Sequence, residues 1–294
     1  MKRAVLFVSV HKKNSKEAAL QIQRELASRD VAVTVFPFAD SSDKPPQGNW
    51  DIALSLGGDG TVLFAARSLA GAGTPIIPIN LGTLGFIANV KADNWLAVFE
   101  KWERGEADYS PRCMLEVAVE RKKQTISKNI CLNDAVVSAT GIAKLIKLKV
   151  HTSLAPNDCT DLGFYRCDGF IVSTPTGSTA YSLAAGGPIL DPEMEATILN
   201  PICPFTLSSR PLVLPSNLAL TITVAEDQRS GVLLTVDGQD AYALESDDKI
   251  TIQQAGCYAK LISANRSAYY AALRTKLSWA GTPVVADNEG GNHA

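Results

Sequence analysis

Short apolar runs alternate with amphipathic segments over the first hundred residues. Four runs in which nearly every residue is apolar are strand candidates, at residues 4–10, 31–36, 52–56 and 75–79. Helical spacing between them predicts a helix that Asn14 caps together with Glu17, and further helices over residues 61–69 and 92–102. Apolar strands separated by helices indicate a parallel sheet covered on both faces. We therefore predict an α/β domain of the Rossmann or flavodoxin type over residues 1–108.

The hydrophobic pattern changes to strict alternation near residue 109. Alternating runs cover residues 114–121, 124–137, 145–151, 169–173, 218–224, 233–236 and 249–252. Alternation is typical of half-buried strands in antiparallel sheets, so we predict a mainly antiparallel β domain over residues 109–265. Helical spacing returns at residues 268–279. We expect this carboxyl-terminal segment, about residues 266–294, to pack back on the first domain.

Composition narrows the class of protein. The chain has 294 residues, which is enough for two domains. Its hydrophobic fraction of 46% and charged fraction of 20% are typical of soluble globular proteins. The net charge of −2 provides no general basic field, which argues against nucleic acid as a partner. No apolar run reaches about 18 residues, the length of a membrane-spanning helix, so we expect a cytoplasmic protein that does not enter membranes.

Cysteines and histidines offer little material for metal or nucleophilic chemistry. The six cysteines form no CxxC pair, which argues against zinc and redox motifs and favours free thiols in a reducing cytoplasm. The three histidines are far apart in the sequence, at positions 11, 151 and 293. A Ser-His-Asp triad or a histidine-ligated metal site is therefore not expected, and we predict no metal site built from the protein alone.

The most informative motif is Gly57-Gly58-Asp59-Gly60-Thr61, between the apolar run at residues 52–56 and a helical segment. Glycines let the backbone approach an anion, and the N–H groups at a helix start carry partial positive charge, so this turn predicts a phosphate site. In a parallel sheet it lies at the carboxyl end of a strand, where ligands bind. A carboxylate repels phosphate, so Asp59 indicates proton acceptance from a hydroxyl or help in holding a metal ion. Helix capping without chemistry is the alternative.

A second unusual stretch runs from Asp168 to Pro188. A strand leads into five hydroxyl residues within seven positions, and small residues follow. Hydroxyls suit a polyhydroxylated or phosphorylated ligand, small residues let it approach the backbone, and Tyr181 could stack on a ring. An ordinary Ser/Thr-rich turn before a helix is the alternative. Neither a Walker A motif nor a GxGxxG motif occurs, so GGDGT is the sole candidate for a phosphate-binding motif in the sequence.

Together these motifs resemble those of bacterial NAD kinases, members of the ATP-NAD kinase family, which phosphorylate the 2′-hydroxyl of the adenosine ribose of NAD. GGDGT alone is also similar to lipid kinases and phosphofructokinases. The combination is specific, and it adds the sequences NLGTLGF, LND at residues 132–134, DGFIVSTPTGSTAYSLAAGGPIL and PFTLSSRP. The resemblance covers nearly the whole chain, and it implies an enzyme that produces NADP.

The resemblance also implies roles for individual residues. Asp59 matches the proton acceptor of the family. The residues implied to contact NAD are Asp59, Gly60, Asn133, Asp134, Lys144, Arg166, Asp168, Thr176, Thr179, Ala180, Tyr181, Ser182, Leu183, Ala184 and Gln239. The residues expected near the ATP phosphates are Gly57, Gly58, Gly60, Thr61 and Arg67. Asp134 stands where most family members carry Glu, and for Arg67 an ion pair with an acidic side chain is an equal alternative.

Substrates and assembly follow from the same resemblance. We expect NAD and ATP as substrates, with Mg²⁺ or another divalent cation on the ATP phosphates because the sequence has no dedicated cage of carboxylates. The family implies a homodimer or homotetramer, in which one subunit could lend residues to its neighbour's site. Two other functions stay open at this point. One is a lipid or sugar kinase that shares GGDGT, and the other is a regulator that binds NAD(P) without chemistry.

Overall fold

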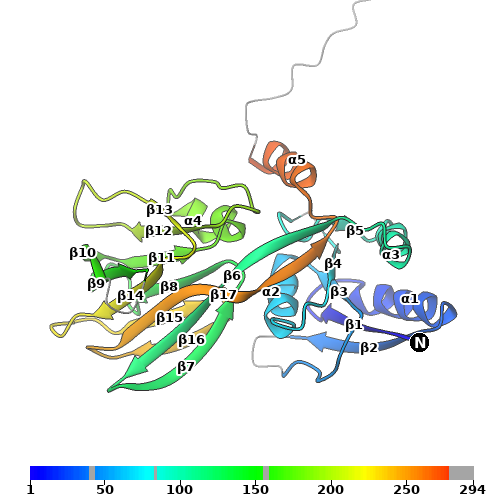
Figure 1. Ribbon diagram of the computed structural model, residues 1–294, viewed down its shortest axis with the longest axis horizontal. Helices are drawn as coiled ribbons and strands as arrows, with labels where there is room; N and C mark the ends of the chain where they lie inside the picture. The colour runs from blue at the N-terminus through cyan, green and yellow to red at the C-terminus, as the bar shows by residue number, and fades with distance from the viewer. Residues whose placement is uncertain (40–43, 83–84, 155–158, 278–294) are drawn as a thin grey trace, which may run out of the picture.

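The computed structural model describes residues 1–39, 44–82, 85–154 and 159–277. Its strands form one sheet of eleven strands and one of six. The parallel strands and helices α1, α2 and α3 lie at one end of the molecule, and the antiparallel strands lie at the other (Figure 1). None of the described helices combines the length and the apolar content needed to cross a bilayer.

The amino-terminal part is a parallel sheet with helices on both faces. Its strands lie in the order β4-β3-β1-β2, β5 lies beside β4, and each of these pairings is parallel. On one face Leu6 packs in a cluster with Leu26 and Phe99, and on the other Phe7 packs against Phe64. The predicted parallel α/β architecture is confirmed. The element bounds are β1 (Lys2–Ser9), α1 (Ser15–Ser28), β2 (Val31–Phe38), β3 (Ile52–Gly57), α2 (Asp59–Ser68), β4 (Ile76–Asn80), β5 (Val90–Lys91) and α3 (Trp95–Glu103).

The carboxyl-terminal part is a sandwich of antiparallel strands, as predicted. One layer is the six-stranded sheet β13-β12-β11-β8-β15-β16, and the other is the run β10-β9-β14-β17 of the larger sheet, extended by β6 and β7. Buried side chains such as Val137 and Ile222 fill the space between the layers. The strand bounds are β6 (Tyr109–Arg121), β7 (Gln124–Cys131), β8 (Asp134–Ala139), β9 (Ile146–Ser153), β10 (Cys159–Cys167), β11 (Gly169–Ser173), β12 (Ala196–Ile202), β13 (Leu212–Pro215), β14 (Ala219–Val224), β15 (Val232–Val236), β16 (Asp240–Leu244) and β17 (Lys249–Ile262).

Strand β17 belongs to both parts of the molecule. It pairs antiparallel with β6 and β14, and at its end Leu261 pairs in parallel with Ile76 of β4 (Figure 1). Helix α5 (Arg266–Leu277) follows and also contacts both parts. The Tyr269 ring lies 6.4 Å from the Phe86 ring, and its hydroxyl donates a hydrogen bond of 2.7 Å to the Leu190 carbonyl. The domain boundary at residues 108 and 109 stays a prediction.

Several local features differ from the pattern-based prediction, which did not include strands β5, β10, β12, β13 and β16. The alternating run at residues 124–137 is two strands, β7 and β8, which lie in different sheets. β17 is far longer than the predicted 249–252, because an irregularity between Gln254 and Tyr258 breaks its alternation. Asn14 is the N-cap residue of α1, as predicted, but its φ is 64° and its side chain makes no capping hydrogen bond. The end of the helix predicted at residues 268–279 lies outside the described residues.

Candidate functional site

Asp59 is the first residue of α2, directly beyond the end of β3. Its carboxylate accepts hydrogen bonds from the backbone N–H groups of Phe86, Ile87 and Ala88 at 3.1, 3.2 and 2.8 Å. These donors follow β4, the strand beside β3, so they fix the carboxylate at the carboxyl edge of the parallel sheet. A carboxylate offers about four lone-pair positions, so Asp59 can accept one further donor such as a hydroxyl.

Gly85 makes this arrangement possible. A β-carbon on Gly85 would lie 1.8 Å from Oδ1 of Asp59, so only glycine lets the chain pass so close to the carboxylate. Its N–H donates to the carbonyl of Ala88 at 2.9 Å, and the side-chain amide of Asn80 donates to the same carbonyl at 2.9 Å. The described part of NLGTLGF is thus built around Asp59, and its residues 83–84 lie outside the described residues.

The hydroxyl-rich run after β11 is used mainly for internal hydrogen bonds. Thr174 Oγ1 donates to the Leu132 carbonyl at 2.6 Å, and Ser178 Oγ donates to the Pro175 carbonyl at 2.6 Å. Ser173 and Thr179 likewise donate to backbone carbonyls nearby. Four of the five hydroxyls therefore donate hydrogen bonds within the turn and help to shape it.

Thr176 and Asn133 are different, because each has a buried polar atom without a partner. Thr176 Oγ1 and Asn133 Oδ1 have no hydrogen-bond partner among the described residues. Gly177 brings the two segments together, since a β-carbon there would lie 2.3 Å from the Asn133 carbonyl oxygen. Buried polar atoms are nearly always hydrogen-bonded in folded proteins. A polar ligand would supply the missing partners.

Asp134 lines a hollow of about 350 Å³, together with Asn133, Ala180, Tyr181 and Asp237. Burial, and then the charge of Asp237, raise the pKa of Asp134 to about 7. Burial also raises the pKa of Asp237, although the N–H groups of residues 132–134 donate to its carboxylate at 2.7 to 3.1 Å. Near neutral pH, Asp134 can therefore either donate or accept a hydrogen bond in this hollow.

Arg67 and Gln239 join α2 to the turn between β15 and β16. Arg67 forms an ion pair with Asp240, donates to Gln239 Oε1 at 2.9 Å and lies 4.0 Å from the Asp237 carboxylate. Gln239 Nε2 in turn donates to the carbonyl of Gly60 at 2.8 Å. The structure thus favours the ion pair over the phosphate contact for Arg67. The turn between β15 and β16 also brings the Asp59 turn and the Asn133 segment together, because Gln239 bonds Gly60 and Asp237 bonds the Asn133 N–H.

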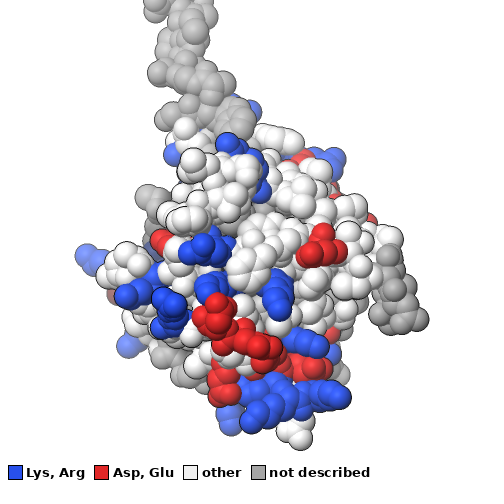
Figure 2. All heavy atoms as spheres, turned by 90° about the vertical axis from the view of Figure 1, so that its left-hand side faces the viewer, with Lys and Arg blue, Asp and Glu red and all other residues white. Residues whose placement is uncertain are grey.

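Three of the predicted contacts lie at the other end of β8. The backbone carbonyl of Asp168 accepts a hydrogen bond from the N–H of Ala139, the last residue of β8, at 3.0 Å, whereas Asp134 begins the same strand five residues earlier. At about 3.4 Å per residue these ends are about 17 Å apart. Lys144 and Arg166 line a hollow of about 650 Å³ at this far end. Figure 2 shows that the surface at the β9–β10 end carries basic and acidic side chains next to each other; those lining the hollow are Lys144, Lys147, Arg166, Asp227 and Arg229.

The remaining predicted contacts belong to the short helices η1 (Thr176–Thr179) and α4 (Tyr181–Ala184). Ala180 and the exposed Tyr181 line the hollow beside Asp134. Ser182 is fully buried, and the side-chain amide of Asn200 donates to the backbone and side-chain oxygens of Ser182 at 2.9 and 3.3 Å. The Ser182 side chain therefore supports the helix. Leu183 and Ala184 complete the turn of α4.

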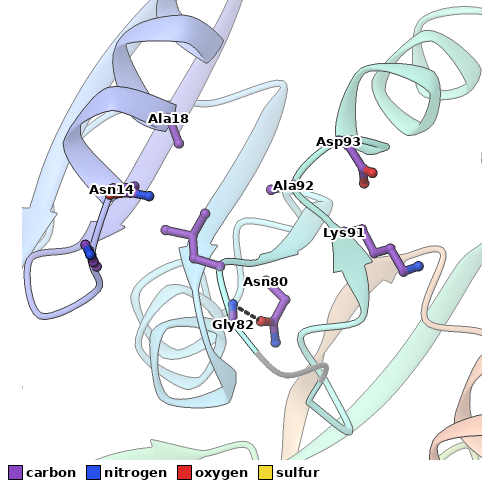
Figure 3. Close-up of a pocket in the computed structure, with 9 residues that line it drawn as sticks. Asn14, Ala18, Asn80, Gly82, Lys91, Ala92 and Asp93 are labelled. Carbon is purple, nitrogen blue, oxygen red and sulfur yellow. Dashed lines mark hydrogen bonds between the residues drawn. The ribbon is translucent and has the colours of Figure 1, made fainter.

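The sequence reasoning assigned no role to the lysines at the carboxyl edge of the parallel sheet. A hollow of about 480 Å³ lies between the start of α1, the end of β4 and residues 91–93, and Figure 3 shows the residues that line it. Lys13 and Lys91 line it, and Lys12 lies next to it. The pair Lys12-Lys13 directly after the first apolar strand is the signal in the sequence that could have indicated these residues.

Comparisons with known proteins match this arrangement to one family. The model of the ATP-NAD kinase N-terminal domain matches residues 2–107, and that of the C-terminal domain matches residues 132–264. An NAD kinase of Treponema denticola is 41% identical, over 96% of this chain and 98% of the relative, and one of Geobacter sp. (strain M21) is 36% identical, over 95% and 99%. Among solved structures, an Archaeoglobus fulgidus NAD kinase in complex with ATP has a TM-score of 0.72 and 26% identity, over 95% of this chain and 99% of that one. The yeast NADH kinase complexed with NADH shares the fold, with a TM-score of 0.83 and 24% identity, over 96% and 89%.

Proposed function

Because this chain belongs to the ATP-NAD kinase family, we propose that it transfers the γ-phosphoryl group of ATP to the 2′-hydroxyl of the adenosine ribose of NAD. The products are NADP and ADP. The chain is an enzyme that phosphorylates NAD, and the choice of hydroxyl and the roles of single residues are the parts that we propose. The observation that carries the proposal is the Asp59 carboxylate, held by three N–H groups beside a glycine turn.

Asp59 is the proposed proton acceptor. A ribose hydroxyl is a poor nucleophile, and phosphoryl transfer depends on its alignment with the γ-phosphate and on a group that takes its proton. The three backbone donors hold the Asp59 carboxylate in one orientation, with an acceptor position left for the hydroxyl. The N–H groups at the start of α2, after Gly57 and Gly58, are suited to the phosphate of the donor.

The dinucleotide is proposed to lie against Asn133, Asp134 and Thr176. Asn133 Oδ1 and Thr176 Oγ1 are buried without partners among the described residues, and Asp134 lines the adjoining hollow. An adenosine group offers hydrogen-bond donors and acceptors on its ring and its ribose that can fill these positions. Gln239 adds to the site indirectly, because it holds the Gly60 carbonyl.

A divalent cation is proposed to arrive with ATP. Among the described residues no cluster of three or more His, Cys, Asp or Glu side chains could hold a metal ion. A cation bound chiefly by the phosphates of the donor fits this chain, and it would supply charge neutralisation for the transferred group. We place the reaction in the cytoplasm, where both proposed substrates are present.

The coupled assay that tests this function uses purified protein, NAD, ATP and Mg²⁺, with NADP detected by an NADP-specific dehydrogenase. We expect NADP from the wild type, and a loss of about 10²- to 10⁴-fold in kcat for Asp59→Asn, which cannot accept the proton. A thermal melt of each protein verifies folding. A folded wild type that forms no NADP, with NADH and other phosphoryl donors also tried, would overturn the proposed reaction. Near-normal kcat in Asp59→Asn would overturn the role of Asp59 alone.

We further propose a homodimer or homotetramer in which two subunits complete one site. Asp168 lies about 17 Å along β8 from the Asp134 end, and Lys144 and Arg166 line the hollow at that far end, so a neighbouring copy is proposed to bring them to the dinucleotide. Mixing two inactive variants tests this arrangement, because Asp59→Asn and Arg166→Ala would damage different halves of a shared site. We expect the mixture, after subunit exchange, to recover about a quarter of wild-type activity. Light scattering that shows a monomer at assay concentration would contradict it, as would a mixture with no recovery.

A further inference from the structure

We propose that Lys12 binds the phosphate groups of the donor at the carboxyl edge of the parallel sheet, between the Gly57–Thr61 turn and the segment after β4. The inference deepens the function proposed above and rests on it for the identity of the donor. It assigns a positively charged side chain to the site, because the glycine turn itself contains none.

The position of Lys12 follows from the strand order. β3 lies between β1 and β4, and all three are parallel, so their carboxyl ends lie side by side. Lys12 follows β1, Gly58 follows β3, and Gly82 follows β4. A methyl group on Gly58 would lie 3.8 Å from Cε of Lys12, and one on Gly82 would lie 3.8 Å from its Nζ. The Lys12 side chain therefore crosses the end of β3 and brings its ammonium group beside the end of β4.

Among the described residues, no acidic side chain accounts for this course of the Lys12 side chain. Lys12 forms no ion pair within the described residues, and the nearby Asp59 carboxylate is held by three backbone N–H groups. Lys12 is exposed, so an extended side chain in water was equally available to it. An ammonium group beside two glycine segments and the amino terminus of α2 is an arrangement that binds phosphate.

Two further lysines lie beyond Lys12, in the hollow that Gly82 adjoins. Gly82, which adjoins the Lys12 ammonium group, also lines the hollow of about 480 Å³ (Figure 3). Lys13 and Lys91 line the same hollow, and among the described residues that line it the one carboxylate is that of Asp93. A polyphosphate bears several negative charges, which matches three lysines in one region. Lys12 is the lysine beside the Asp59 turn, so the geometry assigns it to the phosphate nearest the reacting hydroxyl.

The test compares Lys12→Ala and Lys12→Arg with Lys16→Ala, an exposed lysine of α1 that lines no part of the hollow. Calorimetry with MgATP in the absence of NAD gives the Kd, and the coupled assay gives KM for each substrate. Loss of a charge-assisted hydrogen bond should weaken MgATP binding and raise KM for ATP roughly 10- to 100-fold in Lys12→Ala. KM for NAD should stay unchanged. Lys12→Arg should retain most of the affinity because it keeps the charge, and Lys16→Ala should match the wild type.

The outcomes separate this inference from the proposed reaction. If the wild type makes NADP while folded Lys12→Ala keeps the wild-type Kd and KM for ATP, the role of Lys12 is overturned and the reaction stands. An equal loss of affinity in Lys16→Ala would also overturn it, because a general charge effect would then explain the result. If MgATP binds through Lys12 but no NADP forms, the inference stands and the proposed acceptor is wrong.

Discussion

At the scale of single residues, two buried carboxyl groups set the electrostatics of the candidate site. Asp134 and Asp237 are buried close enough for the negative charge of one to raise the pKa of the other. Of the two, only Asp237 is stabilised by three N–H donors and by the charge of Arg67. Burial and the charge of Asp237 raise the pKa of Asp134 to about 7, so near neutral pH a protonated Asp134 carboxyl is accessible. A site that accepts an uncharged adenosine group can use a protonated carboxyl as a donor there.

Replacing Asp134 with Asn should change how stability depends on pH. The pKa of Asp134 is about 7 in the folded protein against 3.8 for an ordinary Asp, so its contribution to stability is present below about pH 4 and is lost as pH rises towards 7. Urea unfolding between pH 4 and pH 8 measures the free energy of unfolding of both proteins. That of Asp134→Asn should rise relative to that of the wild type by at most about 1.4 kcal/mol per pH unit, with no further rise above pH 7. Exposed Asp247→Asn is the control. Parallel pH profiles for Asp134→Asn and the wild type would contradict the raised pKa.

At the scale of elements, helix α5 connects the two motifs of the site. Tyr269 packs against Phe86, whose N–H binds Asp59, and its hydroxyl bonds the Leu190 carbonyl. The Leu190 N–H in turn donates to Ser178 Oγ at 3.1 Å, within the second motif. The helix is therefore placed to keep the Asp59 segment and the hydroxyl-rich segment at a fixed separation.

Removing the Tyr269 hydroxyl tests this connection. Tyr269→Phe should lower the free energy of unfolding by about 0.5–1.5 kcal/mol, because it leaves the Leu190 carbonyl without its tyrosine donor. Chemical denaturation measures the change. Tyr270→Phe is the matched control, since the Tyr270 hydroxyl bonds Asp191 at an exposed position and its loss should cost less. Equal losses in both variants would contradict a special role for the buried hydroxyl.

Element by element, the sequence was most informative where hydrophobic patterns are uniform. The apolar strands of the parallel sheet were predicted almost residue by residue, because burial on both faces leaves one pattern. β13 was missed because its four residues are largely exposed at a sheet edge. The break between β7 and β8 was missed because a local pattern cannot show that a chain changes sheets. The GGDGT motif and Asn133 are recognisable from residue types within a short stretch of sequence. The path of the Lys12 side chain depends instead on the order of three strands in the sheet.

At the scale of the whole molecule, β17 and Arg67 are among the connections that join the two parts in space. β17 reaches the parallel sheet, where Leu261 pairs with Ile76, and Arg67 binds the β15–β16 turn through Asp240. The site lies between these two connections, since Gly60 is bonded to Gln239 and the Asn133 segment to Asp237. Residues that are far apart in sequence are thereby brought together.

The shared strand β17 has a consequence for motion during turnover. A hinge between the two parts would have to break the backbone pairing of β17 with β4 as well as the Arg67 ion pair. Enzymes that close by swinging whole domains do so about a few residues of unpaired chain. We therefore expect the connecting segments at the strand ends to enclose the substrates, and product release to depend on their rearrangement more than on a swing of one part against the other.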